Sequence, residues 1–376
     1  MNNEKTDLRP IGGQRNYGID ALRIVSMLMV VTLHVLMKGG VLEGSNSLSS
    51  QIAWFIEIAA YCSVNCYALI SGYVGVYSKY KISNLAVLWC RVVFYTVPIT
   101  LAFRFLIPGS VSNKNLISSF FPIFTEQYWY FTSYAVLFLF IPILNEGLKR
   151  LSKRTLRFIL ISIVIAFFLE RAIIKPFWGD VFDLDDGYSA WWLMVLYLIG
   201  GYIRRDGLFQ KIKAHRSILF SALFLASVTI TWLSKLVIQT VLKNPSGAVH
   251  YDRLLIQYQS VTILAAAVFL LLAFENINFH SAIIKIVAFL SPLAFSVYLI
   301  HENKLLSARF IMDKFAWLAD MPAYIMIPLL LGIVFGIYLL CTAIDLIRHY
   351  LFKALKLKER FERLELRIRK KASRNA

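Results

Sequence analysis

Long apolar stretches recur along nearly the whole chain and are separated by short polar breaks. A stretch of roughly 17 to 25 mainly apolar residues is long enough to cross a bilayer as a helix. The pattern therefore predicts an all-α, polytopic membrane protein with about ten transmembrane helices. The expected ranges are 17–37, 51–77, 85–107, 128–146, 157–173, 191–203, 217–241, 254–275, 283–301 and 323–347.

The polar segments are too short for a separate soluble domain. We expect one membrane domain over 17–347, with a cytoplasmic N-terminal tail, 1–16, and a basic cytoplasmic tail, 348–376. The N-terminal residues lack the order of a cleavable signal, so the first helix is expected to remain as an anchor. Prolines inside or beside the expected helices predict kinks at four positions: Pro98, Pro142, Pro292 and Pro328.

Composition supports the membrane class. Hydrophobic residues make up 58% of the chain and charged residues only 16%, and the mean hydropathy is +0.63. These values lie outside the range of ordinary soluble domains. All four cysteines fall in apolar stretches, so we interpret them as small core residues without a disulfide or a metal: Cys62, Cys66, Cys90 and Cys341.

The positive charges predict the orientation of the helices. Of the 40 Lys and Arg residues, 25 fall on the side of the two termini, 8 on the opposite side and 7 within the expected spans. Cytoplasmic flanks are richer in Lys and Arg, so both termini are expected in the cytoplasm. The net charge of +18 then indicates orientation and contact with anionic membrane lipids, with no nucleic acid as a partner.

The C-terminal segment "KALKLKERFERLELRIRKKASR" carries apolar residues at helical spacing among many basic ones. It predicts an amphipathic helix on the inner leaflet of the cell membrane. A solvated basic anchor is the alternative interpretation.

The first expected helix contains three ionisable residues, Asp20, Arg23 and His34. His34 lies eleven positions after Arg23, which at 100° per residue is three turns plus about 20°, so both lie on one face about 16 Å apart. Ionisable groups inside a membrane face the protein interior or a wet cavity and indicate function. The structural alternatives are an interfacial arginine paired with Asp20 and a histidine bonded across helices.

Further polar residues fall in other expected helices. His301 and Glu302 end the ninth helix in the same half of the bilayer as His34, where two histidines and a carboxylate suit proton transfer. Arg91 lies about two turns into the third helix, on the side of Arg23. A pair of guanidinium groups near the cytoplasm suits the phosphates of a donor molecule.

Candidate substrate contacts lie in the second and fourth helices. In "SVNCYALISGYVGVY" we expect Ser71, Gly72 and Tyr73 to break the helical pattern near the inner side. Trp129 and Tyr130 begin the fourth helix in "EQYWYFTSY". An aromatic belt at the membrane surface is the alternative interpretation of the last two.

The chain resembles the acyltransferase 3 family of membrane proteins, which includes surface-polysaccharide O-acetyltransferases. The resemblance rests on four pieces in the same order as in the family. They are "GIDALRIVSMLMVVTLH", with its arginine and histidine separated by ten residues, "VNCYALISGYVGVYSKYK", "QYWYFTSYAVLFLFIPIL" and "SPLAFSVYLIHEN". The family also has about ten helices and a cytoplasmic N-terminus.

The resemblance implies transfer of an acyl group, usually acetyl, from cytoplasmic acyl-coenzyme A to a hydroxyl of a surface or lipid-linked glycan. In that case His34 is the catalytic histidine, and Arg23 binds the donor or supports catalysis. Transfer can be direct or pass through an acyl-histidine. The implied donor substrate is acyl-CoA, and no metal is expected.

One family motif is only half present. The family has two arginines separated by two residues at the start of the third helix. Here Arg91 matches one of them, but Leu88 and Phe94 occupy the positions three residues away. Lys79 and Lys81 are the expected substitutes as contacts for the donor phosphates.

Two other function classes fit a polar groove in a membrane protein. The first is a carrier or flippase for a glycan or lipid-linked intermediate, with the histidines as proton relays. The absence of a visible internal repeat argues against it. The second is a sensor or scaffold without chemistry, for which Arg23 and His34 would be dispensable. No motif indicates an oligomeric state.

Two polar loops invite site interpretations that we do not favour. The loop "KPFWGDVFDLDDGYSA" lacks the full EF-hand pattern, so we expect a solvated acidic loop and no calcium site at Asp180, Asp183, Asp185 and Asp186. The segment "VLKNPSGAVHYDR", with His250 and Asp252, is expected to be an ordinary loop.

Overall fold

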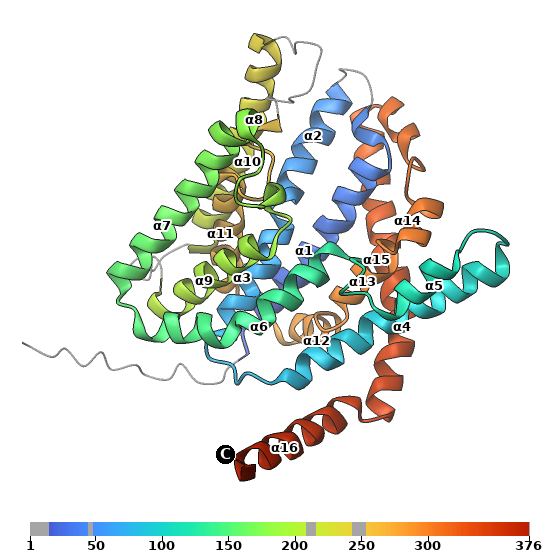
Figure 1. Ribbon diagram of the computed structural model, residues 1–376. Helices are drawn as coiled ribbons and strands as arrows, with labels where there is room; N and C mark the ends of the chain where they lie inside the picture. The colour runs from blue at the N-terminus through green and yellow to red at the C-terminus, as the bar shows by residue number, and fades with distance from the viewer. Residues whose placement is uncertain (1–14, 44–47, 208–215, 243–252, 376) are drawn as a thin grey trace, which may run out of the picture.

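A computed structural model describes residues 15–43, 48–207, 216–242 and 253–375 of the chain. These residues are helical with connecting turns and contain no strand, so the predicted all-α membrane class is confirmed. The helices form one bundle with α16 beneath it (Figure 1). Most of the N-terminal tail, His250 and Asp252 lie outside the described residues.

The helices follow one another closely along the chain. In order they are α1 (Tyr17–Leu33), η1 (His34–Lys38), η2 (Val41–Glu43), α2 (Leu48–Tyr61), α3 (Ser63–Gly75), α4 (Ile82–Leu106), α5 (Asn113–Phe120), α6 (Trp129–Arg150), α7 (Lys153–Leu169), η3 (Glu170–Ile174), α8 (Lys175–Trp178), η4 (Asp185–Gly187), α9 (Ala190–Asp206), α10 (Arg216–Leu242), α11 (Val261–Glu275), α12 (Ser281–Leu290), α13 (Ala294–His301), α14 (Lys304–Phe310), η6 (Ala316–Asp320), α15 (Ala323–Ala354) and α16 (Leu357–Asn375).

Each of the ten predicted ranges holds a helix, but fewer helices are long and apolar enough to cross a membrane. Within the described residues six qualify, or seven if α12 and α13 form one bent span. The count of ten is therefore not confirmed. The short α9 and α11 have 17 and 15 residues. Hydropathy alone cannot tell a helix buried in the core from one that spans lipid, because both are apolar.

Helix α1 lies at the centre of the bundle. It packs against α2, α3, α11, α12, α13 and α15, and 61% of its most apolar window is buried inside the protein. The corresponding windows of α4, α10 and α15 are only 22–33% buried, which leaves apolar surface for lipid. Polar groups on α1 therefore face other helices.

The predicted kink at Pro292 coincides with a break in the helix. Helices α12 and α13 meet at an angle of 41° across Ser291 and Pro292, as expected where proline removes a backbone donor. The other three prolines lie inside α4, α6 and α15. The bend matters because α13 carries His301 toward α1.

Helices α3 and α9 approach each other closely through glycine. A Cβ added at Gly72 would lie 1.9 Å from the Tyr197 carbonyl oxygen, and one at Gly200 would lie 2.0 Å from the Leu69 carbonyl oxygen. Small residues allow this backbone approach in membrane bundles.

We expect Gly72→Ala to lower the free energy of unfolding by about 1–3 kcal/mol, because the two backbones must separate to admit the methyl group. The thermal unfolding midpoint of the detergent-solubilised protein measures this effect. Gly336→Ala in α15 is the matched control, since a Cβ there meets nothing within 4 Å. Equal midpoints for the two variants would contradict this packing argument.

The acidic loop before α9 is more ordered than the sequence predicts. Asp186 pairs with Arg171 at 2.7 Å and with Lys175 at 2.8 Å. Asp180 accepts hydrogen bonds from the amides of Leu184 and Asp185. The expectation of a solvated loop holds only for the exposed Asp183 and Asp185. The carboxylates of Asp180 and Asp186 form ion pairs with basic residues that follow α7, Arg171 and Lys175.

Candidate active site

His34 occupies the point where α1 changes its winding. The α-helix ends at Leu33, and a π-helical turn, His34–Lys38, continues it. Such single π turns widen a helix by one residue and occur often at functional sites. Val35 and Leu36 are fully buried, so core packing fixes the turn.

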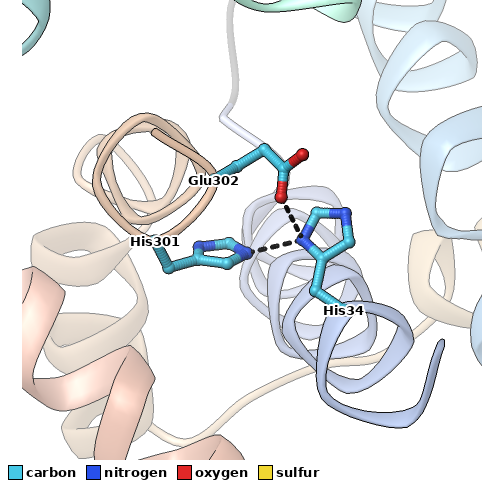
Figure 2. A group of neighbouring side chains, drawn as sticks. All are labelled: His34, His301 and Glu302. Atoms are coloured by element: carbon cyan, nitrogen blue, oxygen red, sulfur yellow. Dashed lines mark hydrogen bonds and ion pairs between the residues drawn. The ribbon is translucent and has the colours of Figure 1, made fainter. Parts of the chain in front are cut away.

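The His34 side chain contacts two residues that lie far from it in the sequence, His301 and Glu302 (Figure 2). Its Nδ1 atom lies 2.8 Å from His301 Nε2 and 3.2 Å from Glu302 Oε2. His301 is the last residue of α13, and Glu302 follows it as the C-cap. The bend at Pro292 and the end of α1 bring the three side chains together.

The hydrogen bonds define which nitrogen of each ring carries the proton. His301 Nδ1 lies 2.6 Å from the Val297 carbonyl oxygen, which only accepts, so His301 donates there and its neutral Nε2 accepts. His34 must then donate from Nδ1 to His301 Nε2. The lone pair of neutral His34 is consequently on Nε2, and Figure 2 shows this atom on the side away from His301 and Glu302. Neutral His34 therefore presents a free base.

Lys38 completes this cluster from the last position of the π turn. Its Nζ atom forms an ion pair with Glu302 Oε1. Glu302 thus bridges the ammonium of Lys38 and the ring of His34. A carboxylate beside the ring stabilises an imidazolium if His34 takes up a proton.

The three side chains of His34, His301 and Glu302 also offer donor atoms that lie within 4.8 Å of one another. Two histidines and a carboxylate are a common ligand set for zinc or iron. Here the Lys38 ammonium already pairs with Glu302 and would repel a cation. The donor set is therefore a poor fit for a metal, and the expectation that no metal is needed stays a prediction.

A narrow cavity of about 40 Å³ opens at His34 and is lined mainly by aromatic side chains. Trp129 and Tyr130, predicted as substrate contacts, both line it. The ring of Trp129 lies 4.5 Å from Tyr188 and 6.0 Å from Tyr258, measured between ring centroids. The positions of Trp129 and Tyr130 in the cavity wall favour the prediction of substrate contacts over that of an aromatic belt at the membrane surface.

Arg23 lies about three turns before His34 on α1, as the sequence implies. Its Nη1 atom donates to Asp20 Oδ1 at 2.6 Å, and Asp20 also accepts from Ser291 and pairs with Arg15. Tyr67 donates to the Arg23 carbonyl oxygen at 2.8 Å. Asp20 therefore anchors Arg23, as in the structural alternative, but the guanidinium keeps about 30% of its side-chain surface exposed.

Three cavities meet at Arg23. They have volumes of about 450, 310 and 190 Å³, so this end of the bundle is far more open than the His34 end. The predicted donor contacts distribute among them: Arg91 lines the second, and Lys79 and Lys81 line the third. Ser71 lines the second and third cavities, and Tyr73 lines the first.

The cavities at Arg23 and His34 share walls. Tyr67, Tyr130 and Phe295 line both the second Arg23 cavity and the His34 cavity. Adjoining cavities therefore extend along α1 from Arg23 to His34, and these three rings form the wall between them. A long flexible molecule held at Arg23 can point its end toward His34.

Arg91 sits at the edge of a buried ionic network. Its Nη1 atom donates weakly to the Pro292 carbonyl oxygen at 3.4 Å, and its buried Nε atom has no hydrogen-bond partner among the described residues. Nearby, Arg348 forms two hydrogen bonds to Asp345, and Tyr95 also donates to that carboxylate. Arg91 thus keeps donors available for a ligand.

The remaining candidates have partners that limit their freedom. Lys81 pairs with Glu362 of α16 at 2.9 Å, whereas Lys79 is exposed. Tyr73 donates to Glu275 at 2.7 Å and accepts from Arg204 at 2.8 Å. Ser71 donates to the Tyr67 carbonyl oxygen within its own helix.

Several residues of the site were missed at the sequence level. Arg204 lines the widest Arg23 cavity beside Tyr73, yet the sequence shows it only as part of a basic loop. Lys38 lies four residues after His34, a spacing that places it on the same side of a helix. Tyr67, Tyr258 and Tyr298 line cavities shared with His34 or Arg23, but one tyrosine among many in apolar helices gives no signal.

Comparison with known proteins gives one result that bears on the chain. A family model described as an acyltransferase domain, Acyl_transf_3, matches residues 16–346. The match runs from the start of α1 into α15 and contains every cavity-lining residue named above. Comparisons with curated proteins and with solved structures found no match.

Proposed function

The chain belongs to the acyltransferase 3 family, and from this premise we propose that it is an O-acyltransferase of the cell membrane. The donor is acyl-CoA, with acetyl as the expected acyl group, and the acceptor is a hydroxyl of a cell-surface or lipid-linked glycan. The observation that carries the proposal is the run of cavities from a cluster of arginines at one end of α1 to the free base of His34 at the other.

The arginine end suits the phosphates of coenzyme A. Arg23 and Arg91 line one cavity and Lys79 and Lys81 a neighbouring one, and Arg204 adds a further guanidinium. Guanidinium groups bind phosphate in pairs of hydrogen bonds. In this proposal the pantetheine arm follows the shared wall of Tyr67, Tyr130 and Phe295 and carries the thioester to His34.

The acceptor hydroxyl meets the thioester at His34. His34 Nε2 removes the hydroxyl proton while the acceptor oxygen forms a bond to the thioester carbonyl carbon. The carbon–sulfur bond then breaks, and the coenzyme A thiolate leaves with the proton from the imidazolium. Glu302, 3.2 Å from Nδ1, stabilises the imidazolium between these two steps, and His301 keeps the ring in the correct tautomer.

In this proposal the distribution of Lys and Arg and the cytoplasmic location of the donor set the orientation of the protein in the membrane. Acyl-CoA is cytoplasmic, so the Arg23 end of α1 faces the cytoplasm, with both termini on that side. His34 then lies in the outer half of the bilayer, where a surface glycan approaches. The aromatic wall of Trp129, Tyr130 and Tyr258 suits a sugar ring, because aromatic faces pack against its C–H groups.

A transfer assay tests the proposal. Purified protein in proteoliposomes is given radiolabelled acetyl-CoA, and release of label to water or to a glycan acceptor is measured. Acyl-CoA consumption that depends on His34 supports an acyltransferase. Flux of a lipid-linked glycan in the absence of any acyl donor, with no consumption of acetyl-CoA, would instead indicate the carrier.

A further inference from the structure

Helix α16 is joined to the end of α15 by a short turn and lies against the first turns of α4. Helix α15 ends at Ala354, α16 begins at Leu357, and Lys356 between them has a positive φ of 49°. Figure 1 shows α16 turned away from the axis of α15, beneath the bundle near the start of α4. The helix therefore begins where a membrane span ends.

An acidic edge of α16 holds the start of α4. The two carboxylate oxygens of Glu365 accept hydrogen bonds from the amides of Ile82 and Ser83 at 3.2 and 3.0 Å. Glu362 pairs with Lys81 at 2.9 Å. The first amides of a helix have no partner within it, and a carboxylate there is favourable. Glu365 thus caps α4 from another helix.

The charge of Glu365 supports this contact. Burial alone raises the pKa of its carboxyl, but the hydrogen bonds from Ser83, Ile82 and Arg369 outweigh burial and lower the pKa to about 2. The carboxylate stays ionised at neutral pH. Its contribution is complete above the ordinary carboxyl pKa and is lost as the pH falls toward 2.

A second face of α16 is apolar, half-buried at its start and exposed at its end. Leu357, Phe361, Leu364 and Ile368 fall within an arc of about 60° at 100° per residue. Leu364 and Ile368 leave 51% and 60% of their surface exposed. An apolar stripe on a surface helix requires an apolar partner.

A third face, on the flank opposite the acidic edge, is basic. Its members share an arc of about 100° and are all exposed: Arg360, Arg363, Arg367, Lys370 and Lys371. An apolar stripe flanked by basic residues is typical of helices that lie in the plane of anionic headgroups.

We propose that α16 binds the anionic phospholipid surface next to the bundle and, while bound there, holds Lys81 and the first turn of α4 in place. The apolar face enters the acyl-chain boundary, the basic face contacts phosphates, and the acidic edge stays on α4. Lys81 lines the third Arg23 cavity, and α4 carries Arg91. Lipid bound to α16 therefore stabilises the donor end of the site, a consequence that rests on the proposed function.

Lipid contact is tested on the full-length protein in nanodiscs. A fluorescent NBD probe is attached at Ile368→Cys, in a Cys90→Ser background, in phosphatidylcholine alone and with phosphatidylglycerol. We expect quenching by nitroxide lipids and loss of quenching by aqueous iodide when phosphatidylglycerol is present. A probe equally open to iodide in both lipids would overturn the proposal. A probe shielded to the same degree in detergent would also overturn it, by pointing to a protein partner.

Neutralising the basic face should reverse the lipid effect. The variant Arg360→Gln, Arg363→Gln, Arg367→Gln and Lys370→Gln is expected to lose the dependence on phosphatidylglycerol. If it retains that dependence, the basic face is not the contact.

The matched control removes four exposed positive charges from the junction of α6 and α7: Lys149→Gln, Arg150→Gln, Lys153→Gln and Arg154→Gln. It should keep the full dependence on phosphatidylglycerol. Loss of the dependence in this control would show that net charge matters and not the face of α16.

The link to α4 has its own measurement. Glu365→Ala should accelerate hydrogen exchange at the amides of Ile82 and Ser83, because they lose their acceptor, whereas Glu359→Ala on the exposed side should not. Unchanged exchange in Glu365→Ala would overturn the link. Neither exchange nor quenching needs acyl-CoA, so these results stand apart from any failure of the transfer assay.

Discussion

His34→Ala should lower acyl transfer by about 10²–10⁴-fold, the usual contribution of a general base. The substitution removes the imidazole that lines the aromatic cavity, and with it the Nε2 lone pair that takes up the proton in the proposed mechanism. The rate of transfer from radiolabelled acetyl-CoA, at saturating donor, measures the loss. Because His34 does not line the Arg23 cavities, where the donor is proposed to bind, the KM for acetyl-CoA should change little.

Two companion variants separate chemistry from packing. Glu302→Gln keeps the side-chain volume but removes the negative charge 3.2 Å from Nδ1, so we expect a smaller loss of kcat than in His34→Ala. The thermal unfolding midpoint of His34→Ala should stay close to that of the unaltered protein. Normal transfer by folded His34→Ala in cells or vesicles would exclude this histidine as the base.

Arg23→Ala should lower kcat/KM for acetyl-CoA by about tenfold to a hundredfold, since a hydrogen bond to a charged group contributes about 1.5–3 kcal/mol. The loss should appear mainly in KM, because Arg23 holds the donor far from the reacting atoms. Asp20 keeps Arg15 and Ser291 as partners in the variant, so the local fold should survive.

A shortened donor isolates the phosphate contact. Acetyl-pantetheine carries the same thioester without the phosphates of coenzyme A, so Arg23→Ala and the unaltered protein should use it equally well. Arg104→Ala is the control, because Arg104 donates a hydrogen bond to Asn113 at the exposed end of α4 and lines none of the three Arg23 cavities. An equal loss with both donors would mean that Arg23 acts on the chemical step or on the fold and does not bind phosphate.

The sequence predicts the family and the relative positions of Arg23 and His34 correctly, and the second of these has a simple physical reason. Arg23 and His34 lie on one helix, and their separation along the chain fixes their relative direction through the helical repeat. The four matching pieces were also enough to identify the acyltransferase 3 family, which the match over residues 16–346 confirms. Acetyl specificity, the glycan acceptor and the donor contacts stay proposals.

The number of spans could not be obtained in the same way. The helix α11 is as apolar as a membrane span, but α9 and α11 are short, and more than half of the residues of each are buried. Hydropathy records that a residue avoids water and does not record whether lipid or protein surrounds it.

The partners of Arg23 illustrate a further limit. The sequence predicts Asp20 as its partner because the two residues are three positions apart on one helix. It cannot predict the hydrogen bond from Tyr67 of α3 to the Arg23 carbonyl, the bond from Ser291 to Asp20 or the cavity that Arg23 shares with Arg91 of α4. Such contacts depend on how whole helices pack.

By itself the sequence determined the helical segments, the membrane class and the common face of Arg23 and His34, because these depend on residues close together along the chain. It also determined the family, through four matching pieces that need no knowledge of how the helices pack. Only the tertiary structure decided that His301 and Glu302, separated from His34 by more than two-thirds of the chain, lie against its Nδ1 atom. That contact needs the π turn at His34 and the 41° bend before α13. Pro292 accounts for the bend, but the approach of α13 to the end of α1 depends on packing between distant helices, which local periodicity does not encode.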